Sequence, residues 1–456
     1  MTHKVRYISL GVLGLLLTVS AIIFFLHRKN TYMSSLPEQM QAVAVLDVRK
    51  LGQKHVFVPS AEQQTFLENS GLDLEKQIFA FVDEENATGV LLPLASRKRW
   101  ESLLRERGLS VESQRGMYWT RWSNWLLVFS DDRCLAYGPL SEQEMDRTRG
   151  KMAGLMRQNE KADNRLLQQM GQDNDAPLSV AFSANLARHL VTRFVPEMAD
   201  ACSGLWDGDV FVNLKPQGKT LLLDAELVCP NAEASTSFLL PLGRNAVAKL
   251  SPDHLASLSV GVDGELLLKN LRKLPRLRTQ LLALNMCIDA DMMIRSLRGA
   301  LTLGIPRTGD ALSGSLLKAQ LSDTRFLQNS SDWGQGFAQG LGMNLTSLSD
   351  SCFSLSALGQ TFCFGVSQGT LVASTDRHTF QEACREAERN PDNIVDDAEG
   401  AVLYAQVSLP ALADNAGFLF LLMDKQFSSV MESFKQFDTL TLRVRRTAAK
   451  LSDEKD

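Results

Sequence analysis

The chain has 456 residues, of which 45% are hydrophobic and 22% charged, and its formal net charge is −4. This composition is typical of folded domains and argues against extended disorder. Residues 30–456 carry 44 Lys and Arg against 52 Asp and Glu. An acidic balance argues against a nucleic-acid-binding protein, which needs a basic face, so no nucleic-acid partner is expected.

The stretch Ile8 to Leu26 is nineteen residues long and carries no charge. A helix of this length covers the hydrocarbon core of a bilayer, which is about 30 Å thick. A cleaved signal peptide is the alternative, but its apolar region is shorter and ends in a small-x-small site. The sequence therefore predicts an uncleaved transmembrane anchor. Residues 1–29 form the cytoplasmic tip and this helix, and the rest of the chain faces the periplasm from the bacterial inner membrane.

The next residues, 30–36, are expected to form a polar tether before segments typical of strands and helices alternate. A strand is predicted at 42–48 and helices at 61–69, 73–81 and 97–107. Short strands are predicted at 89–94, before the last of these helices, and at 117–120, 125–129 and 134–137 after it. Ser141 and Glu144 form a capping box for a long helix. The stretches 209–214 and 220–228 flank Pro-Gln-Gly-Lys and predict an antiparallel hairpin.

Four segments after residue 250 loosely repeat earlier segments in the same order. For example, Leu403-Tyr-Ala-Gln-Val-Ser-Leu resembles Val180-Ala-Phe-Ser-Ala-Asn-Leu. A diverged tandem duplication explains this, and chance similarity between generic strand and helix sequences is the alternative. The predicted organisation is a first repeat at 37–229, a connection at 230–249, a second repeat at 250–446 and a charged tail at 447–456. The predicted fold class is α+β, with an N-terminal transmembrane helix followed by two similar halves of antiparallel sheet covered by helices.

Catalytic motifs are either absent or in the wrong local context. Gly365-Val-Ser-Gln-Gly369 matches the G-x-S-x-G of serine hydrolases, but a strand-like Thr-Leu-Val-Ala-Ser follows it where a helix is required. The glycines at 334, 336, 340 and 342 miss the dinucleotide-binding spacing. The six histidines are scattered, and no cysteine motif has metal-binding spacing. Neither a cofactor nor a metal is expected, and no catalytic residue is assigned.

Two groups of residues are candidates for other roles. Cys352 and Cys363 lie on neighbouring strand-like segments, where they either form a disulfide across a hairpin or remain two free thiols. Tyr118, Trp119, Trp122 and Trp125 form an aromatic cluster, in which residues 119 and 125 would be cross-strand neighbours. This cluster is either part of the core or an exposed patch that binds a peptide or glycan.

Several of these segments resemble an uncharacterised family of duplicated bacterial envelope proteins that are membrane- or lipid-anchored. The resembling residues are Leu36-Pro37 with Ala42–Asp47, Gly71-Leu-Asp-Leu-Glu, the stretch from Phe364 to Asp376, and Leu403-Tyr-Ala. The resemblance implies an envelope location and a duplicated fold, and it supplies no catalytic residue. The function expected is that of a membrane-anchored, non-catalytic envelope protein with a periplasmic binding or assembly role; its partner is unknown, with an envelope protein and a glycan as the candidates. A hydrolase whose site is assembled from distant residues is the alternative.

Overall fold

The computed structural model describes most of the chain after residue 30. The described residues are 31–54, 56, 61–158, 164–170, 175–194, 208–229, 238–244, 246–286, 288–307, 314–333, 344–357, 360–387, 394–415 and 436–448. The chain divides into two compact units, residues 1–182 and 183–456. We describe each unit separately.

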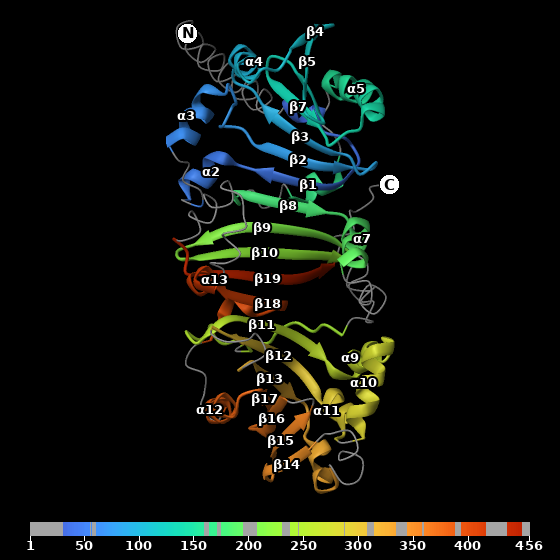
Figure 1. The fold of residues 1–456 in the computed structure, drawn as a ribbon, viewed down its shortest axis with the longest axis vertical. Helices are drawn as coiled ribbons and strands as arrows, with labels where there is room; N and C mark the ends of the chain where they lie inside the picture. Colours follow the sequence, from blue (N-terminus) through green and yellow to red (C-terminus); the bar gives the residue numbers. More distant parts are fainter. Residues whose placement is uncertain are drawn as a thin grey trace, which may run out of the picture. The chain divides into compact units, whose positions relative to one another are not determined.

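The first unit is an antiparallel sheet with helices packed against it (Figure 1). Its strands pair in the order β8-β1-β2-β3-β7-β6-β5-β4. The strands are β1 Met40–Leu46, β2 Ile78–Asp83, β3 Thr88–Pro93, β4 Glu112–Gln114, β5 Met117–Trp122, β6 Trp125–Phe129, β7 Arg133–Tyr137 and β8 Leu178–Phe182. The helices are η1 Thr31–Ser35, α2 Val48–Gln53, α3 Ala61–Asn69, α4 Arg97–Glu106, α5 Glu142–Arg157 and α6 Arg165–Met170.

The core of the first unit forms where α4 meets the sheet. The side chain of Ser96 accepts a hydrogen bond from the backbone N–H of Arg99 and so caps the first turn of α4. Trp100 and Leu104, one helical turn apart, then pack against Leu127 and Phe129 of β6.

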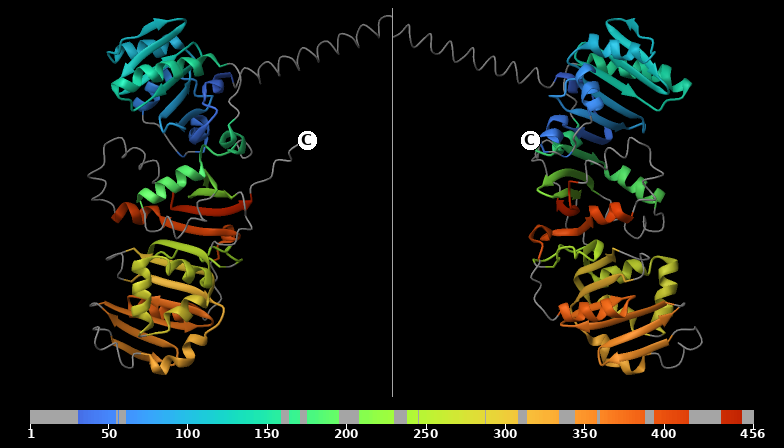
Figure 2. Two further views of the ribbon diagram at one scale, coloured as in Figure 1. Left: turned by 90° about the vertical axis from the view of Figure 1, so that its right-hand side faces the viewer. Right: turned by 60° about the vertical axis from the view of Figure 1, so that its left-hand side comes forward.

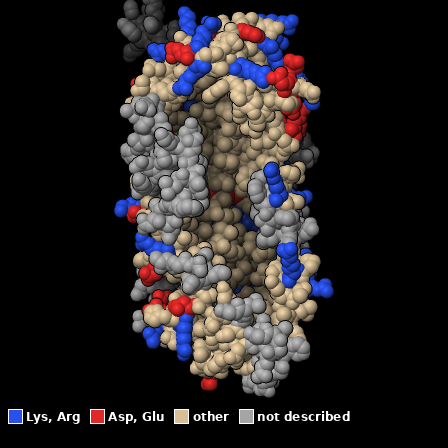
Figure 3. All heavy atoms as spheres, viewed as in Figure 1, with Lys and Arg blue, Asp and Glu red and all other residues tan. Residues whose placement is uncertain are grey.

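In the view of Figure 3, charged side chains gather over α4 and α5, whereas the surface over β2 and β3 carries few charges.

The second unit contains eleven described strands, which pair in the order β9-β10-β19-β18-β11-β12-β13-β17-β16-β15-β14. The strands are β9 Asp209–Gln217, β10 Thr220–Cys229, β11 His254–Asp263, β12 Leu297–Pro306, β13 Leu316–Leu321, β14 Asn344–Ser349, β15 Cys352–Ala357, β16 Gln360–Ser367, β17 Thr370–Ser374, β18 Ala401–Ser408 and β19 Thr439–Ala448. The helices are α7 Ala184–Phe194, α9 Gly264–Leu271, α10 Pro275–Asn285, α11 Ala290–Arg295, η3 Arg325–Asp332, α12 Arg377–Ala387, η5 Asp396–Ala398 and α13 Leu409–Asn415.

The strand β19 lies between β10 and β18, and it pairs in parallel with β10 from Thr220↔Thr439 to Cys229↔Ala448. A buried carboxylate marks this junction. Asp224 of β10, whose side chain is 5% exposed, accepts hydrogen bonds from Arg443 at 2.9 Å and from Arg445 at 3.0 and 3.1 Å. Lys215 of β9 adds a third cation at 3.3 Å. The pairing of β10 with β19 is therefore fixed by side-chain charges as well as by backbone hydrogen bonds.

The same pairing order occurs in both units. The strand β1 pairs with β2 and β8, as β11 pairs with β12 and β18. The series β2-β3-β7-β6-β5-β4 corresponds in the same way to β12-β13-β17-β16-β15-β14. A tandem duplication would produce this common order. The predicted repeat bounds, however, put β9 and β10 in the first half, whereas the structure places them in the second unit.

The fold class predicted from the sequence is wrong in two respects. The sheet is mixed and not antiparallel throughout as predicted, because β10 and β19 of the second unit run in parallel. In addition, no helix among the described residues is long and apolar enough to cross a membrane, so the predicted transmembrane signal-anchor has no counterpart there. The stretch Ile8 to Leu26 itself lies outside the described residues.

Two local predictions also differ from the structure. The segment 73–81, predicted as a helix, overlaps the start of strand β2 (Ile78–Asp83), in which Phe79, Phe81 and Asp83 are buried alternately along a sheet face. The expected tether at 30–36 instead contains the turn η1, in which Tyr32 is 3% exposed, and Leu36 next to it is fully buried. Apolar side chains therefore attach the start of the described chain to the first unit.

Candidate functional site

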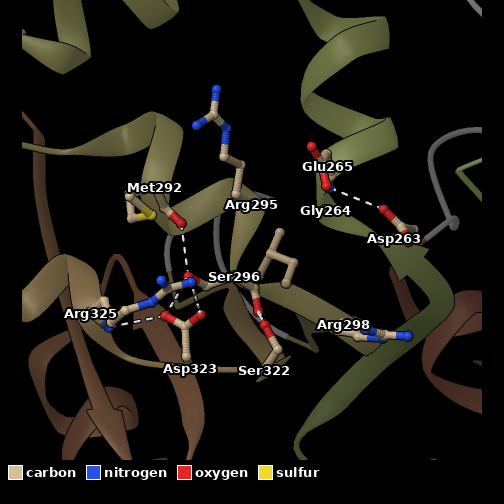
Figure 4. Close-up of a pocket in the computed structure, with 11 residues that line it drawn as sticks. Asp263, Gly264, Glu265, Met292, Arg295, Ser296, Arg298, Ser322, Asp323 and Arg325 are labelled. Atoms are coloured by element: carbon tan, nitrogen blue, oxygen red, sulfur yellow. Dashed lines mark hydrogen bonds and ion pairs between the residues drawn. The ribbon is translucent and has the colours of Figure 1, made fainter.

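A cavity of about 400 Å³ lies in the second unit, between the start of α9, the end of α11, the start of β12 and the segment before η3. Six charged residues line it: Asp263, Glu265, Arg295, Arg298, Asp323 and Arg325. Figure 4 shows how their side chains are arranged. Because α9, α11, β12 and the segment before η3 all contribute, their packing positions the charges.

The wall of the cavity begins where β11 gives way to α9. Asp263 caps this helix, since its side chain accepts hydrogen bonds from the backbone N–H groups of Glu265 at 3.1 Å and Leu266 at 3.0 Å. The next residue, Gly264, lies against the backbone oxygens of Ile294 and Leu297 with no space for a Cβ atom. This glycine allows α9 to pack directly against the end of α11.

The opposite wall is organised by Asp323. Its carboxylate accepts hydrogen bonds from the side chain of Arg325 at 2.9 Å and from the backbone N–H of the same residue at 3.1 Å. The hydroxyl of the buried Ser296 donates to it at 3.4 Å. The hydrogen bond from the Arg325 guanidinium is the main reason that the pKa of Asp323 is lowered. Asp323 is therefore held ionised and paired.

Two arginines of the cavity remain without such partners. Arg295 and Arg298 are exposed, and neither forms an ion pair or side-chain hydrogen bond with any residue that the structure describes. In Figure 4 both side chains extend away from the Asp323–Arg325 pair. Guanidinium groups bind carboxylates and phosphates through paired, charge-assisted hydrogen bonds. The cavity therefore offers two free donors to an anion.

Two of the three carboxylates of the cavity, Asp263 and Asp323, are poorly suited to acid–base chemistry. A general base needs a carboxylate or imidazole that is free to take a proton at the working pH. Asp263 is occupied by backbone N–H groups, and the lowered pKa of Asp323 makes it a weak base. Among the described residues, no group of three His, Cys, Asp or Glu side chains could hold a metal ion. The arrangement is suited to binding.

None of the cavity residues was predicted from the sequence, and the aromatic candidates behave differently from expectation. Trp122 pairs with Trp125 across the β5–β6 hairpin, whereas Trp119 lies opposite Val128. Trp119 is 3% exposed, and Tyr118 stacks on Phe129 with ring centroids 5.4 Å apart. Trp122 is 62% exposed. The four rings do not form one exposed patch, because Tyr118 and Trp119 point to opposite faces of the sheet.

The two candidate cysteines lie on the β15–β16 hairpin, but they are not direct partners. Cys352 is opposite Gly365, and Cys363 is opposite Ser354, so the thiols are diagonal neighbours on one face. Both are free thiols. The G-x-S-x-G segment forms the tight turn after β16, in which Gln368 and Gly369 have positive φ, and the Ser367 hydroxyl donates to the carbonyl of Cys384 at 3.3 Å.

Comparison with known proteins yields only distant likenesses. No protein-family model matches the chain, and no curated protein matches it. Crystal form IV of TP0453 is similar at a TM-score of 0.27 and 9% identity, covering 76% of this chain and 94% of that one. Form III is similar at a TM-score of 0.26 and 6% identity, covering 76% and 95%. Similarity at these TM-scores is too low to support a conclusion about fold or function.

Proposed function

We propose that the protein is a non-catalytic binding protein of the bacterial cell envelope, whose folded part acts in the periplasm. The observation that carries the binding role is the pair Arg295 and Arg298, which line a cavity and make no ion pair with the described residues. Two of the three carboxylates beside them, Asp263 and Asp323, are already held by hydrogen bonds, which leaves the two arginines as donors for a ligand. The envelope location rests on the resemblance of the sequence to anchored envelope proteins.

The binding role is tested with pyrophosphate as a probe of the cavity. The double variant R295Q/R298Q should bind pyrophosphate at least tenfold more weakly than the unchanged chain, because a hydrogen bond to a charged group contributes about 1.5–3 kcal/mol. Isothermal titration calorimetry of the full chain measures this difference. The matched control is K98Q/R99Q on α4, which removes the same charge from exposed positions of the first unit. Equal affinity for R295Q/R298Q and the unchanged chain would contradict the proposal.

The location is tested separately in cells. Protease added to spheroplasts should degrade the folded part of the chain, while a cytoplasmic marker protein stays intact. Fragments are followed with an antibody against the second unit. Survival of the whole chain under conditions that digest a known periplasmic protein would exclude the periplasmic location and leave the anion-binding test unaffected.

A further inference from the structure

The helices α9 and α10 form a basic segment in an otherwise acidic chain. Between Glu265 and Asp289 the sequence contains five basic residues and no acidic one: Lys269, Arg272, Lys273, Arg276 and Arg278. Arg272 forms an ion pair with Asp291, and Lys273 donates to the side chain of Asn270 at 2.9 Å. Lys269 and Arg278 are exposed and have no ion-pair partner in the part of the chain that the structure describes. This segment therefore presents an excess of positive charge.

The same segment exposes large apolar side chains. Leu277, Leu282 and Met286 are 36%, 60% and 48% exposed. Eight large hydrophobic residues are exposed to this extent in the described chain, and three of them lie within these ten residues. Arg278, Leu282 and Met286 follow each other at intervals of four, which places them along one side of the helical segment. Charge and apolar surface thus share the outward face.

The opposite side of α10 holds the helix to its unit. Leu281 is 8% exposed, and Leu284 packs against the core cluster of Ile288 and Phe353. In Figure 2 the two helices, yellow-green to yellow, lie on the outside of the second unit. The buried side of α10 therefore accounts for its packing on the second unit. Leu282 and Met286 on the exposed side have no role in that packing.

We propose that the outward face of α9 and α10 docks on a bilayer surface that contains anionic phospholipid. Interfacial helices combine basic residues with apolar side chains that enter the boundary between headgroups and acyl chains. Each Lys or Arg near an anionic membrane contributes about 1 kcal/mol to binding. A nucleic acid would use the charges but would give Leu282 and Met286 no apolar environment, so the bilayer matches both features.

The proposal is tested by amide hydrogen exchange of the full chain in the presence of vesicles. One set of vesicles contains phosphatidylcholine alone, and the other contains equal parts of phosphatidylcholine and phosphatidylglycerol. Peptides covering residues 266–286 should become protected with the anionic vesicles and should remain unchanged with the neutral ones. This local readout separates docking of α9 and α10 from any contact that another part of the chain makes with lipid.

Variants of the exposed positions assign the effect to its cause. In K269Q/R278Q the lipid concentration for half-maximal protection should rise about thirtyfold, since two charges at about 1 kcal/mol each are lost and 1.4 kcal/mol is a factor of ten. Leu282→Ser should raise it about tenfold through the lost apolar contact. The control K98Q/R99Q removes the same charge from α4 and should leave the midpoint within about twofold.

Three outcomes would overturn the proposal. The first is equal protection by the neutral vesicles, and the second is an unchanged midpoint in K269Q/R278Q. The third is protection of 266–286 by a short RNA duplex without protection by anionic vesicles, which would assign the surface to nucleic acid. All substituted positions are exposed, so circular dichroism should show unchanged folding in each variant.

Discussion

Replacing Asp224 with Asn should lower the free energy of unfolding of the second unit by about 3–5 kcal/mol, the usual cost of removing one partner from a buried ion pair. The neutral amide cannot compensate Arg443, Arg445 and Lys215, which converge on this side chain within 3.3 Å. Urea unfolding followed by tryptophan fluorescence measures the loss. Glu226→Gln is the matched control on the same strand, because Glu226 is exposed and should change stability by about 0.5 kcal/mol or less.

The contribution of Asp224 should also depend on pH. Burial alone raises its pKa, but the hydrogen bonds and charges of Arg443, Arg445 and Lys215 outweigh burial, so the pKa is lowered in the folded state. A carboxylate with a lowered pKa stabilises the fold above its unfolded pKa of about 3.9 and loses that effect as pH falls through the folded value. The stability gap between the unchanged chain and Asp224→Asn should therefore be constant from neutral pH down to about pH 5 and shrink below about pH 4. A gap that persists in stronger acid would show that Asp224 acts by shape and not by charge.

Replacing Gly264 with Ala should destabilise the second unit by about 3 kcal/mol, at the upper end of the range for overpacking. The added methyl group would meet the backbone oxygens of Ile294 and Leu297, which cannot rotate away as a flexible side chain could. The start of α9 must then move, and Asp263 and Glu265 of the cavity move with it. We therefore expect pyrophosphate binding to weaken together with stability.

The control for this change is Gly154→Ala in α5. An added Cβ at residue 154 meets no atom within 4 Å, and alanine is favoured over glycine inside a helix. This variant should be more stable by about 0.5–1 kcal/mol, as measured by urea unfolding. Equal behaviour of the two variants would mean that the close approach of α9 to α11 does not limit the fold.

Local sequence patterns predicted many hairpins of this fold, because their signals lie within a few residues. Alternating side chains around Pro216-Gln-Gly gave the β9–β10 pair, and the strand-like Thr-Leu-Val-Ala-Ser after the G-x-S-x-G match is the strand β17, which pairs with β16. The segment 73–81 was wrongly predicted as a helix because Leu74, Ile78 and Phe81 have helical spacing. Burial in the structure follows the alternation of a strand. Where the spacing of apolar residues fits both a helix and a strand, tertiary packing decides which of the two forms. A single sequence does not show that packing.

The parallel pair β10–β19 and the cavity could not be predicted from local sequence patterns, for a different reason. Asp224 and Arg443 are 219 residues apart, and each of them alone resembles a solvated surface charge. The cavity likewise combines residues from three stretches of chain, none of which carries a motif. Only Gly264 next to the capping residue Asp263 was a local sign that a helix begins there in close contact with another backbone. Charged residues that pair across a long sequence distance leave no periodic pattern in the sequence from which their pairing could be predicted.

The position of β19 has a consequence for the order in which the protein is made. Ribosomes release β9 and β10 long before Thr439–Ala448 is translated, so during that time β10 lacks the neighbour that covers its second edge. An uncovered strand edge is a template for pairing with other chains. Nascent chains halted between residues 230 and 438 should therefore depend on chaperones that shield β10, and this dependence should end when β19 emerges and enters the sheet beside it.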